Sequence, residues 1–317
     1  MFRPARWLPG GHAQTIWPRF ILPPAPAYAR ERIDTPDSDF IDLDWLASPT
    51  DAPAPLVMLF HGLEGSSHSH YARALMHAVA ARGWNGLVVH ARGCSGEPNR
   101  LLRAYHSGDS AELDWLLPLI VPRMQGQPVY AVGVSLGGNV LCKWLGEQGS
   151  AGTALLRAAA SVCAPVDLGA SGRALDMGLN RVYTQYFLRT MKPRALEKAA
   201  LFPGTLDARA IAAGHSIRAF DDAVTSQIHG FRDADDYWTR SSSRPLLAGV
   251  RVPLLLLQAL NDPMVPAASL ATPDMLSPDI LPHYTEQGGH VGYVSGSPKG
   301  HLDWLPQRIL HFFDTGY

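Results

Sequence analysis

The sequence predicts an α/β protein in which a mostly parallel sheet of eight strands is flanked by helices. Short, continuously apolar segments alternate with segments of helical periodicity, which is typical of strands covered on both faces. The alternation stops between about residues 167 and 250, where only helical spacing recurs. We therefore expect a single domain over residues 1–317, with a helical cap inserted at 167–250 between two strands.

The elements are expected in the following order along the chain. Residues 1–30 carry many prolines and predict an irregular N-terminal arm over the surface of the domain. Residues 32–47 predict a hairpin, because apolar and acidic residues alternate in its second half. Further strands are expected at 55–62, 86–93, 129–134, 158–165, 252–260 and 280–284. Helices are expected at about 71–82 and 111–117, directly after residue 135, and at 305–313.

Composition narrows the class of protein. The chain has 317 residues, is 46% hydrophobic and has a formal net charge of −1, so it lacks the basic excess of a nucleic-acid-binding surface. Its three cysteines, Cys94, Cys142 and Cys163, are too few and too widely spaced for a disulfide framework. Because the N-terminus has no apolar signal region, we expect a cytoplasmic protein. The sequence contains no membrane-spanning segment, and it leaves peripheral membrane contact and oligomeric state open.

One turn stands out because a buried strand runs straight into it. Residues 129–139 read VYAVGVSLGGN, so Ser135 lies between Gly133 and Gly137, and a helical stripe of apolar residues follows. This strand–turn–helix pattern holds a serine hydroxyl in the open at the edge of a sheet. The strained backbone costs on the order of 1–3 kcal/mol. Ser135 is therefore the candidate nucleophile.

A serine needs a base, and the base needs an orienting acid. In this type of fold the order along the chain is Ser, then Asp or Glu, then His. Asp262 lies in NDPMVP, where the last strong strand opens into a loop at its carboxyl end. His290 lies in EQGGHVGY, after the last strand and among glycines that allow a close approach. We predict Asp262 as the acid and His290 as the base.

Negative charge on a substrate oxygen needs two backbone N–H donors. The residue after the nucleophile, Leu136, supplies one of them. The second is expected from Leu63 in HGLEGSS, because the turn at Gly62 exposes the next amide. His61 is expected to hold this loop by hydrogen bonding rather than to act as a base.

The predicted cap carries apolar residues at helical spacing: Leu179, Val182, Tyr183, Tyr186 and Phe187. Most of them are expected to pack the cap onto the body, and the rest to line an apolar pocket above the sheet. The candidate pocket residues are Tyr183, Phe187, Trp238 and Met264.

Two other readings receive little weight. His68 and His70 with Glu64 resemble a metal cluster, but no further ligand spacing appears. Cys94 in ARGCSGEPN could indicate redox chemistry, yet a structural loop is the simpler interpretation, with Arg92 and Asn99 bonded to neighbouring loops. We therefore expect neither a metal nor a cofactor.

Longer motifs carry a family resemblance over nearly the whole chain, from about residue 8 to the last helix. They are GGHAQT, HGLEGSSHSHYAR, ARGCSGEPN, GVSLGGNVLCKWLGE, FDDAVTSQIHGFRDADDYW, LNDPMVP and GGHVGY. These resemble the YheT-type branch of the α/β-hydrolases, also called the AB hydrolase 4 family, which includes abhydrolase-domain lipases and esterases. The resemblance implies an α/β-hydrolase fold and a carboxylic ester hydrolase that uses Ser135, Asp262 and His290 without a cofactor. Trp238 departs from the tyrosine that is more usual there, which affects pocket shape.

The leading hypothesis is thus a serine esterase that acts on a small acyl ester of short to medium chain length, or on a monoacylglycerol. Acyl transfer to another alcohol or thiol would use the same residues. A non-catalytic binding protein on a hydrolase scaffold is the third hypothesis, because fold alone does not prove activity. Chemistry with a carboxylate nucleophile is disfavoured because the turn carries a serine.

Overall fold

The computed structural model describes residues 2–46 and 53–316, and it contains the predicted eight-stranded sheet. The strand order is β1-β2-β4-β3-β5-β6-β7-β8. Only the pairs β1–β2 and β2–β4 are antiparallel, so the sheet is mostly parallel as predicted. The strands are β1 (Tyr28–Asp34), β2 (Phe40–Leu46), β3 (Leu56–Phe60), β4 (Asn85–Val89), β5 (Val129–Val134), β6 (Ala158–Val162), β7 (Leu254–Ala259) and β8 (Ile280–Thr285).

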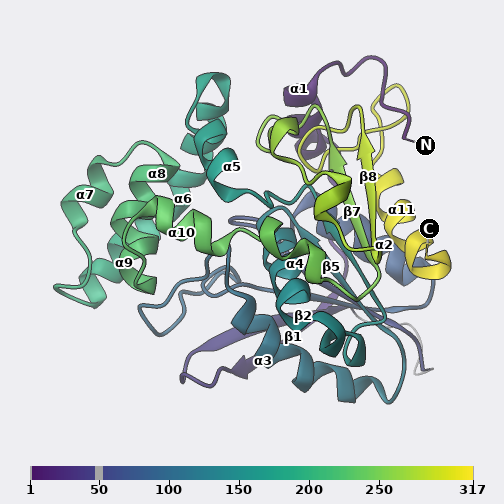
Figure 1. Cartoon of the computed structure of the whole chain (residues 1–317), viewed down its shortest axis with the longest axis horizontal. Coiled ribbons are helices and arrows are strands. Elements are labelled where there is room, and N and C mark those ends of the chain that lie inside the picture. The colour runs from purple at the N-terminus through teal and green to yellow at the C-terminus, as the bar shows by residue number, and fades with distance from the viewer. Residues whose placement is uncertain (1, 47–52, 317) are drawn as a thin grey trace.

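Both faces of the sheet are covered by helices, which explains the continuous hydrophobicity of its central strands. In β3 the side chains at 56, 58 and 60 pack with α3 (Ser110–Ile120) and α4 (Leu136–Gln148). Those at 57 and 59 pack on the opposite face with α2 (His70–Ala81) and α11 (Trp304–Thr315). The result is a three-layer arrangement with two apolar cores (Figure 1).

The residues between β6 and β7 form helices. They lie to one side of the sheet in Figure 1 and have two small apolar clusters of their own. We call residues 168–249 the helical insertion. Its elements are α5 (Leu168–Leu175), η4 (Gly178–Asn180), α6 (Arg181–Leu201), α7 (Ala208–Ala213), α8 (Ile217–Phe220), the π-helical turn η5 (Asp221–Thr225), α9 (Ser226–His229), α10 (Ala234–Ser241) and η6 (Arg244–Gly249).

The expected role of the apolar residues at 179–187, in η4 and the start of α6, was partly wrong. Leu179, Val182 and Tyr186 face solvent, with 75%, 64% and 47% of their surface exposed. The helix instead packs through a different face, which contains Leu188 and Ala195. Residue type alone indicated the wrong stripe because α6 is long and carries apolar side chains on more than one face.

The N-terminal arm contains two short helical segments, α1 (Gly11–Ile16) and η1 (Trp17–Phe20), within the stretch expected to be irregular. Leu8 packs with Val294 and Leu302, next to the loop after β8. The arm therefore lies against the part of the chain that carries His290. The other short helices are η2 (Val121–Met124), η3 (Gly149–Ala154), η7 (Ala267–Ser269) and η8 (Pro273–Met275).

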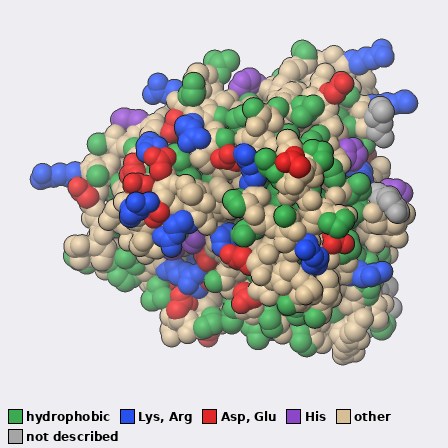
Figure 2. Space-filling view, viewed as in Figure 1, with side chains coloured by type: hydrophobic (Ala, Val, Ile, Leu, Met, Phe, Trp, Pro, Cys, Tyr) green, Lys and Arg blue, Asp and Glu red, His purple; other side chains and the backbone are tan. Residues whose placement is uncertain are grey.

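Among the described residues, neither the surface charge nor the cysteines mark a separate site. Basic and acidic side chains are interspersed over the face shown in Figure 2. All three cysteines are buried and free. Within residues 2–46 and 53–316, no helix is both long enough and apolar enough to cross a bilayer.

Candidate active site

Ser135 occupies a strained turn between β5 and α4. Its φ of 52° and ψ of −119° lie where side chains are rarely tolerated. A Cβ on Gly133 would lie 2.4 Å from the carbonyl oxygen of Gly137, and a Cβ on Gly137 would lie 2.3 Å from that of Phe60. Glycine is required at both places because strand, turn and helix approach one another so closely.

Three side chains from distant parts of the sequence meet at this turn. The hydroxyl oxygen of Ser135 lies 2.9 Å from Nε2 of His290, and Nδ1 of His290 lies 2.8 Å from Oδ2 of Asp262. Since the carboxylate can only accept, Nδ1–H donates to it, and Nε2 is left to accept the serine proton. This is the relay that nucleophilic acyl chemistry needs.

The carboxylate of Asp262 is fixed on all sides. Its side chain is fully buried, and Oδ1 accepts the backbone N–H groups of Met264 and Val265 at 2.8 and 3.1 Å. Oδ2 also accepts from the amide of Gln258 at 3.0 Å. Because both of its oxygens accept hydrogen bonds from fixed donors, the carboxylate cannot rotate, and it holds the imidazole in one orientation.

Cys163 lies beside this group, and the ligand atoms of Cys163, Asp262 and His290 are all within 4.8 Å of one another. The sulfur accepts the N–H of Val291 at 3.3 Å. Burial raises the pKa of the Cys163 thiol, which favours the protonated form rather than the thiolate that binds metal. This donor set fits a hydrogen-bonded relay better than a metal site.

The N-terminal helix α1 supports both loops of the relay. Oε1 of Gln14, a buried side chain, accepts the N–H of Gly288 at 2.9 Å and the side-chain amide of Asn261 at 3.1 Å. The hydroxyl of Thr15 accepts the N–H of His290 at 2.8 Å. Sequence reasoning noted GGHAQT as a family motif but gave these residues no role.

The two residues predicted as oxyanion donors lie on different segments: Leu63 in the loop after β3 and Leu136 at the start of α4. The backbone N–H groups of Leu63 and Leu136 are not taken up by any other group in the described part of the chain. Gly62 brings this loop close, since a Cβ on it would lie 3.1 Å from Cβ of Ser135. The N–H of Gly62 donates to the hydroxyl of Tyr71 at 2.9 Å, which fixes the turn.

His61 holds the same loop by hydrogen bonds, as expected. Its Nδ1–H donates to the carbonyl of Gly62 at 2.8 Å, and its Nε2 accepts the N–H of Ala91 at 3.0 Å. Burial lowers the pKa of His61 to about 4, so the ring is neutral near pH 7. Both nitrogens are engaged in positioning the loop.

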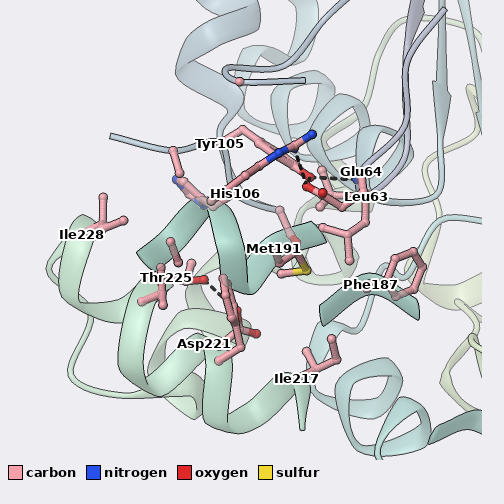
Figure 3. Close-up of a pocket in the computed structure, with 18 of the residues that line it drawn as sticks. Leu63, Glu64, Tyr105, His106, Phe187, Met191, Ile217, Asp221, Thr225 and Ile228 are labelled. Carbon is pink, nitrogen blue, oxygen red and sulfur yellow. Dashed lines mark hydrogen bonds and ion pairs between the residues drawn. The ribbon is translucent and has the colours of Figure 1, made fainter. Parts of the chain in front are cut away.

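A cavity of about 340 Å³ has Ser135 in its wall and lies between the sheet and the helical insertion. Figure 3 shows part of its lining, including Phe187, Met191 and Ile217 of the insertion. Ser135, His290, Leu63 and Leu136 line its wall on the side of the sheet. Its opposite wall is mostly apolar and comes from the insertion: Leu168, Leu175, Phe187, Met191, Ile217, Phe220, Val224, Ile228 and Trp238.

The four candidate pocket residues fall into two groups. Phe187, Trp238 and Met264 line the cavity. Tyr183 is not among the lining residues, and this expectation needs correction. Its ring stacks on His12, and its hydroxyl lies 3.0 Å from Nδ1 of that histidine. Tyr183 and Phe187 are four residues apart on α6 and share a face, but Tyr183 lies one turn nearer the start of the helix, where His12 of the N-terminal arm contacts it.

Asp221 is a buried carboxyl in the wall of the cavity, and sequence reasoning missed it. Its oxygens accept from the indole N–H of Trp238 at 2.8 Å and from the hydroxyl of Thr225 at 2.7 Å. Burial raises the pKa of Asp221 to about 7. It begins the π-helical turn η5, and such turns are frequent at functional sites.

The residues weighed as metal or redox candidates have other partners. His70 donates from Nε2 to the carbonyl of Val291 at 3.0 Å. Burial raises the pKa of the Cys94 thiol to about 12. Arg92 and Asn99 bond the neighbouring loops as expected, both of them to Asp39.

Comparison with known proteins places this geometry in a family. Residues 55–297 match the family model described as the alpha/beta hydrolase fold. The chain is 39% identical over 320 residues to the protein named "Putative esterase YheT" of Escherichia coli K12, covering 99% of this chain and 93% of that protein. It is 29% identical over 304 residues to human "Phospholipase ABHD3", covering 93% of this chain and 74% of that protein.

Solved structures agree on the fold. The Pyrococcus furiosus esterase Pf2001 superposes with a TM-score of 0.57 at 16% sequence identity, over 91% of each chain. The resemblance seen in the motifs is therefore confirmed at the level of fold and of full-length relatives. The chain belongs to the alpha/beta hydrolase family.

Proposed function

We propose that the protein is a serine-dependent carboxylic ester hydrolase. The observation that carries this proposal is the unbroken chain of hydrogen bonds from Ser135 through His290 to Asp262 at the wall of a largely apolar cavity. The names of relatives, an esterase and a phospholipase, support ester chemistry in the same family.

In the first half of the reaction, Nε2 of His290 takes the proton of Ser135 while the serine oxygen attacks the ester carbonyl. The carbonyl oxygen becomes negative and is stabilised by the N–H groups of Leu63 and Leu136. The imidazolium then gives its proton to the leaving alcohol, and an acyl-enzyme remains.

In the second half, water takes the place of the alcohol. His290 removes a proton from the water, the resulting oxygen attacks the acyl group, and the carboxylic acid leaves as the proton returns to Ser135. Asp262 stays ionised throughout and stabilises the imidazolium.

The cavity favours an acyl group of short to medium length. Its volume of about 340 Å³ lies at the lower end of the range for small-molecule sites, and its apolar side chains can bury a hydrocarbon chain. Phe187, Met191 and Ile217 are well placed to contact such a chain, since they line the wall contributed by the insertion.

The proposal is tested with a series of p-nitrophenyl esters from two to twelve acyl carbons, using wild type and Ser135→Ala. We expect hydrolysis with an optimum within the series, and a loss on the order of 10⁴-fold or more in kcat for the variant. Equal, slow rates for both proteins across the series would reject ester hydrolysis. Product analysis in the presence of added alcohols would reveal acyl transfer instead.

A further inference from the structure

Glu64 is a buried carboxylate in the cavity wall that the proposed reaction does not use. It follows Leu63, the oxyanion donor, and only 7% of its side chain is exposed. Its φ of 55° departs from the usual range and turns the residue out of the regular path of the loop. Because it directly follows Leu63 and lines the same cavity as Ser135, we infer that it lies near the position of the reacting carbonyl.

Two side chains fix this carboxylate from outside the loop. The hydroxyl of Tyr105 accepts the N–H of Glu64 at 2.8 Å and donates to Oε1 at 3.0 Å. Arg194 of α6 donates to the same oxygen at 3.1 Å. Figure 3 shows Tyr105, Glu64 and Leu63 close together at the edge of the cavity.

Both of these contacts use Oε1, and the other oxygen is left without one. Oε2 of Glu64 is buried and has no hydrogen-bond partner among the described residues. Buried polar atoms nearly always have a partner, and a carboxylate oxygen is a strong acceptor. Since Oε2 is buried at the cavity wall and its carboxylate is fixed through Oε1, it is suited to accept a hydrogen bond from a ligand.

The charge around Glu64 indicates which kind of ligand group would donate to Oε2. The guanidinium of Arg194 already balances the carboxylate of Glu64. A cationic ligand group would therefore add uncompensated charge in a partly buried place, whereas a hydroxyl would complete the hydrogen bonds without adding any.

We propose that Glu64 is a substrate-recognition residue, and that Oε2 accepts a hydrogen bond from a free hydroxyl on the ester, a few atoms from the scissile bond. This rests on the proposed ester hydrolysis for the identity of the ligand. The hydroxyl can belong to the alcohol part, as in a glycol or glycerol monoester, or to the acyl part, as in a hydroxyacyl ester.

Two pairs of esters separate these sources. The first pair is 2-hydroxyethyl and 2-methoxyethyl butanoate, and the second is ethyl 3-hydroxybutanoate and ethyl 3-methoxybutanoate. Within a pair the hydroxyl hydrogen is replaced by a methyl group, so the ability to donate a hydrogen bond is lost and one methyl group is added. The comparison with Glu64→Gln controls for that added size. We expect wild type to favour the hydroxyl ester in one pair by about 10–10²-fold in kcat/KM, because the acceptor is charged and buried.

The variant Glu64→Gln makes the test specific. Tyr105 and Arg194 both donate, so the amide oxygen must take the place of Oε1 and the NH₂ group that of Oε2. An NH₂ group donates to a hydroxyl and to an ether oxygen alike. In Glu64→Gln, the ratio of kcat/KM for the hydroxyl ester to that for the methoxy ester should therefore fall to within about threefold of one. Glu147→Gln, on the exposed part of α4, is the matched control and should keep the wild-type preference.

Dissociation constants of the same esters in the Ser135→Ala background make this test independent of turnover. A preference that disappears in Glu64→Gln, in kcat/KM or in these constants, supports the role of Glu64, even if wild type hydrolyses none of the esters. Absence of a preference in both pairs overturns it, as does a preference that survives Glu64→Gln. Normal hydrolysis without a preference would leave the esterase proposal intact and reject only the recognition site.

Discussion

The two walls of the cavity are built in different ways. On the side of the sheet, Ser135, Asp262 and His290 project from short loops at strand ends, and their positions are fixed by backbone N–H groups and by glycines. On the side of the insertion, the wall is made of side chains from several helices. Among its polar members, Asp221 and Arg194 bond to other side chains, whereas Lys198 donates to the backbone carbonyls of Asn99 and Leu101.

This difference separates two tasks. Backbone contacts at the carboxyl edge of a parallel sheet hold reacting atoms to fractions of an ångström, which acid–base chemistry requires. Side chains on helices can change without disturbing that edge, so they are suited to setting which ester fits. We infer that changes to Ser135, His290 and their supports on the first wall affect turnover and that changes on the second affect selectivity and stability. Glu64, which Arg194 of the insertion holds in the first wall, is the exception and affects selectivity.

The largest effect is expected for Asp262→Asn. The amide oxygen can keep the N–H groups of Met264 and Val265, which places the NH₂ group toward Nδ1 of His290. Nδ1 would then accept and Nε2 would carry the proton, so Nε2 could not take the proton of Ser135. We expect kcat to fall about 10⁴-fold with little change in KM.

Stopped-flow or extended steady-state assays on the best p-nitrophenyl ester measure this loss. Asp221→Asn, an equivalent change on the other wall, should retain kcat within about tenfold. If the two variants lost similar activity, the division between the walls would be wrong.

An intermediate effect is expected on the pH dependence of stability, and it comes from Asp221 in the insertion. Burial raises the pKa of Asp221 from 3.8 to about 7, so the folded protein holds a proton there that the unfolded chain has released. The free energy of unfolding should therefore fall as the pH rises from about 4 to about 7, and level off above. Between pH 5 and pH 8 this amounts to about 3 kcal/mol.

Urea unfolding of wild type and Asp221→Asn at about pH 5 and about pH 8 measures this change in the free energy of unfolding. The drop in unfolding free energy should be about 3 kcal/mol smaller in Asp221→Asn, because an amide does not titrate. Buried His106 and His229, whose pKa values are lowered to about 3, are present in both proteins and cancel. Asp235→Asn, on the exposed surface of the insertion, is the control and should leave the drop as in wild type. Identical drops in wild type and Asp221→Asn would contradict the raised pKa.

A smaller effect is expected at the N-terminal arm, where Thr15 positions His290 without touching the reacting atoms. Thr15→Val keeps the shape of the side chain but removes the acceptor for the N–H of His290 and the donor to the carbonyl of Gly11. We expect kcat to fall about tenfold, in line with the loss of the hydrogen bond that positions His290, while KM stays unchanged.

Thr15→Ser restores the hydroxyl and should recover most of the wild-type kcat. A change in KM with an unchanged kcat would show that the arm acts on substrate binding rather than on the position of the imidazole.

The sequence predicted the sheet and its loops well because each has a strong local signal. Continuous apolar strands, the Gly-Val-Ser-Leu-Gly turn and the order of serine, acid and histidine are all visible without tertiary information. The structure brings Ser135, Asp262 and His290 into hydrogen-bond contact. Short loops at one sheet edge leave few alternatives for where such residues can lie.

The insertion could not be predicted to the same depth. Apolar residues on α6 occur on several faces, so the pattern did not show that Val182 and Tyr186 face solvent while Leu188 is buried. The partner of Tyr183 is His12, which lies 171 residues away in sequence and has no periodic signal. Asp221 is held by Trp238, so its burial follows from helix packing alone.

The most direct test of the account is the reaction of the intact protein with a fluorophosphonate, followed by mass spectrometry of its peptides. A hydroxyl in hydrogen-bond contact with His290 should form one covalent adduct per chain, located on Ser135, and His290→Ala should slow its formation by several orders of magnitude. A folded wild-type protein that stays unlabelled, or one labelled at another serine, would contradict the central claim that this hydroxyl is the nucleophile.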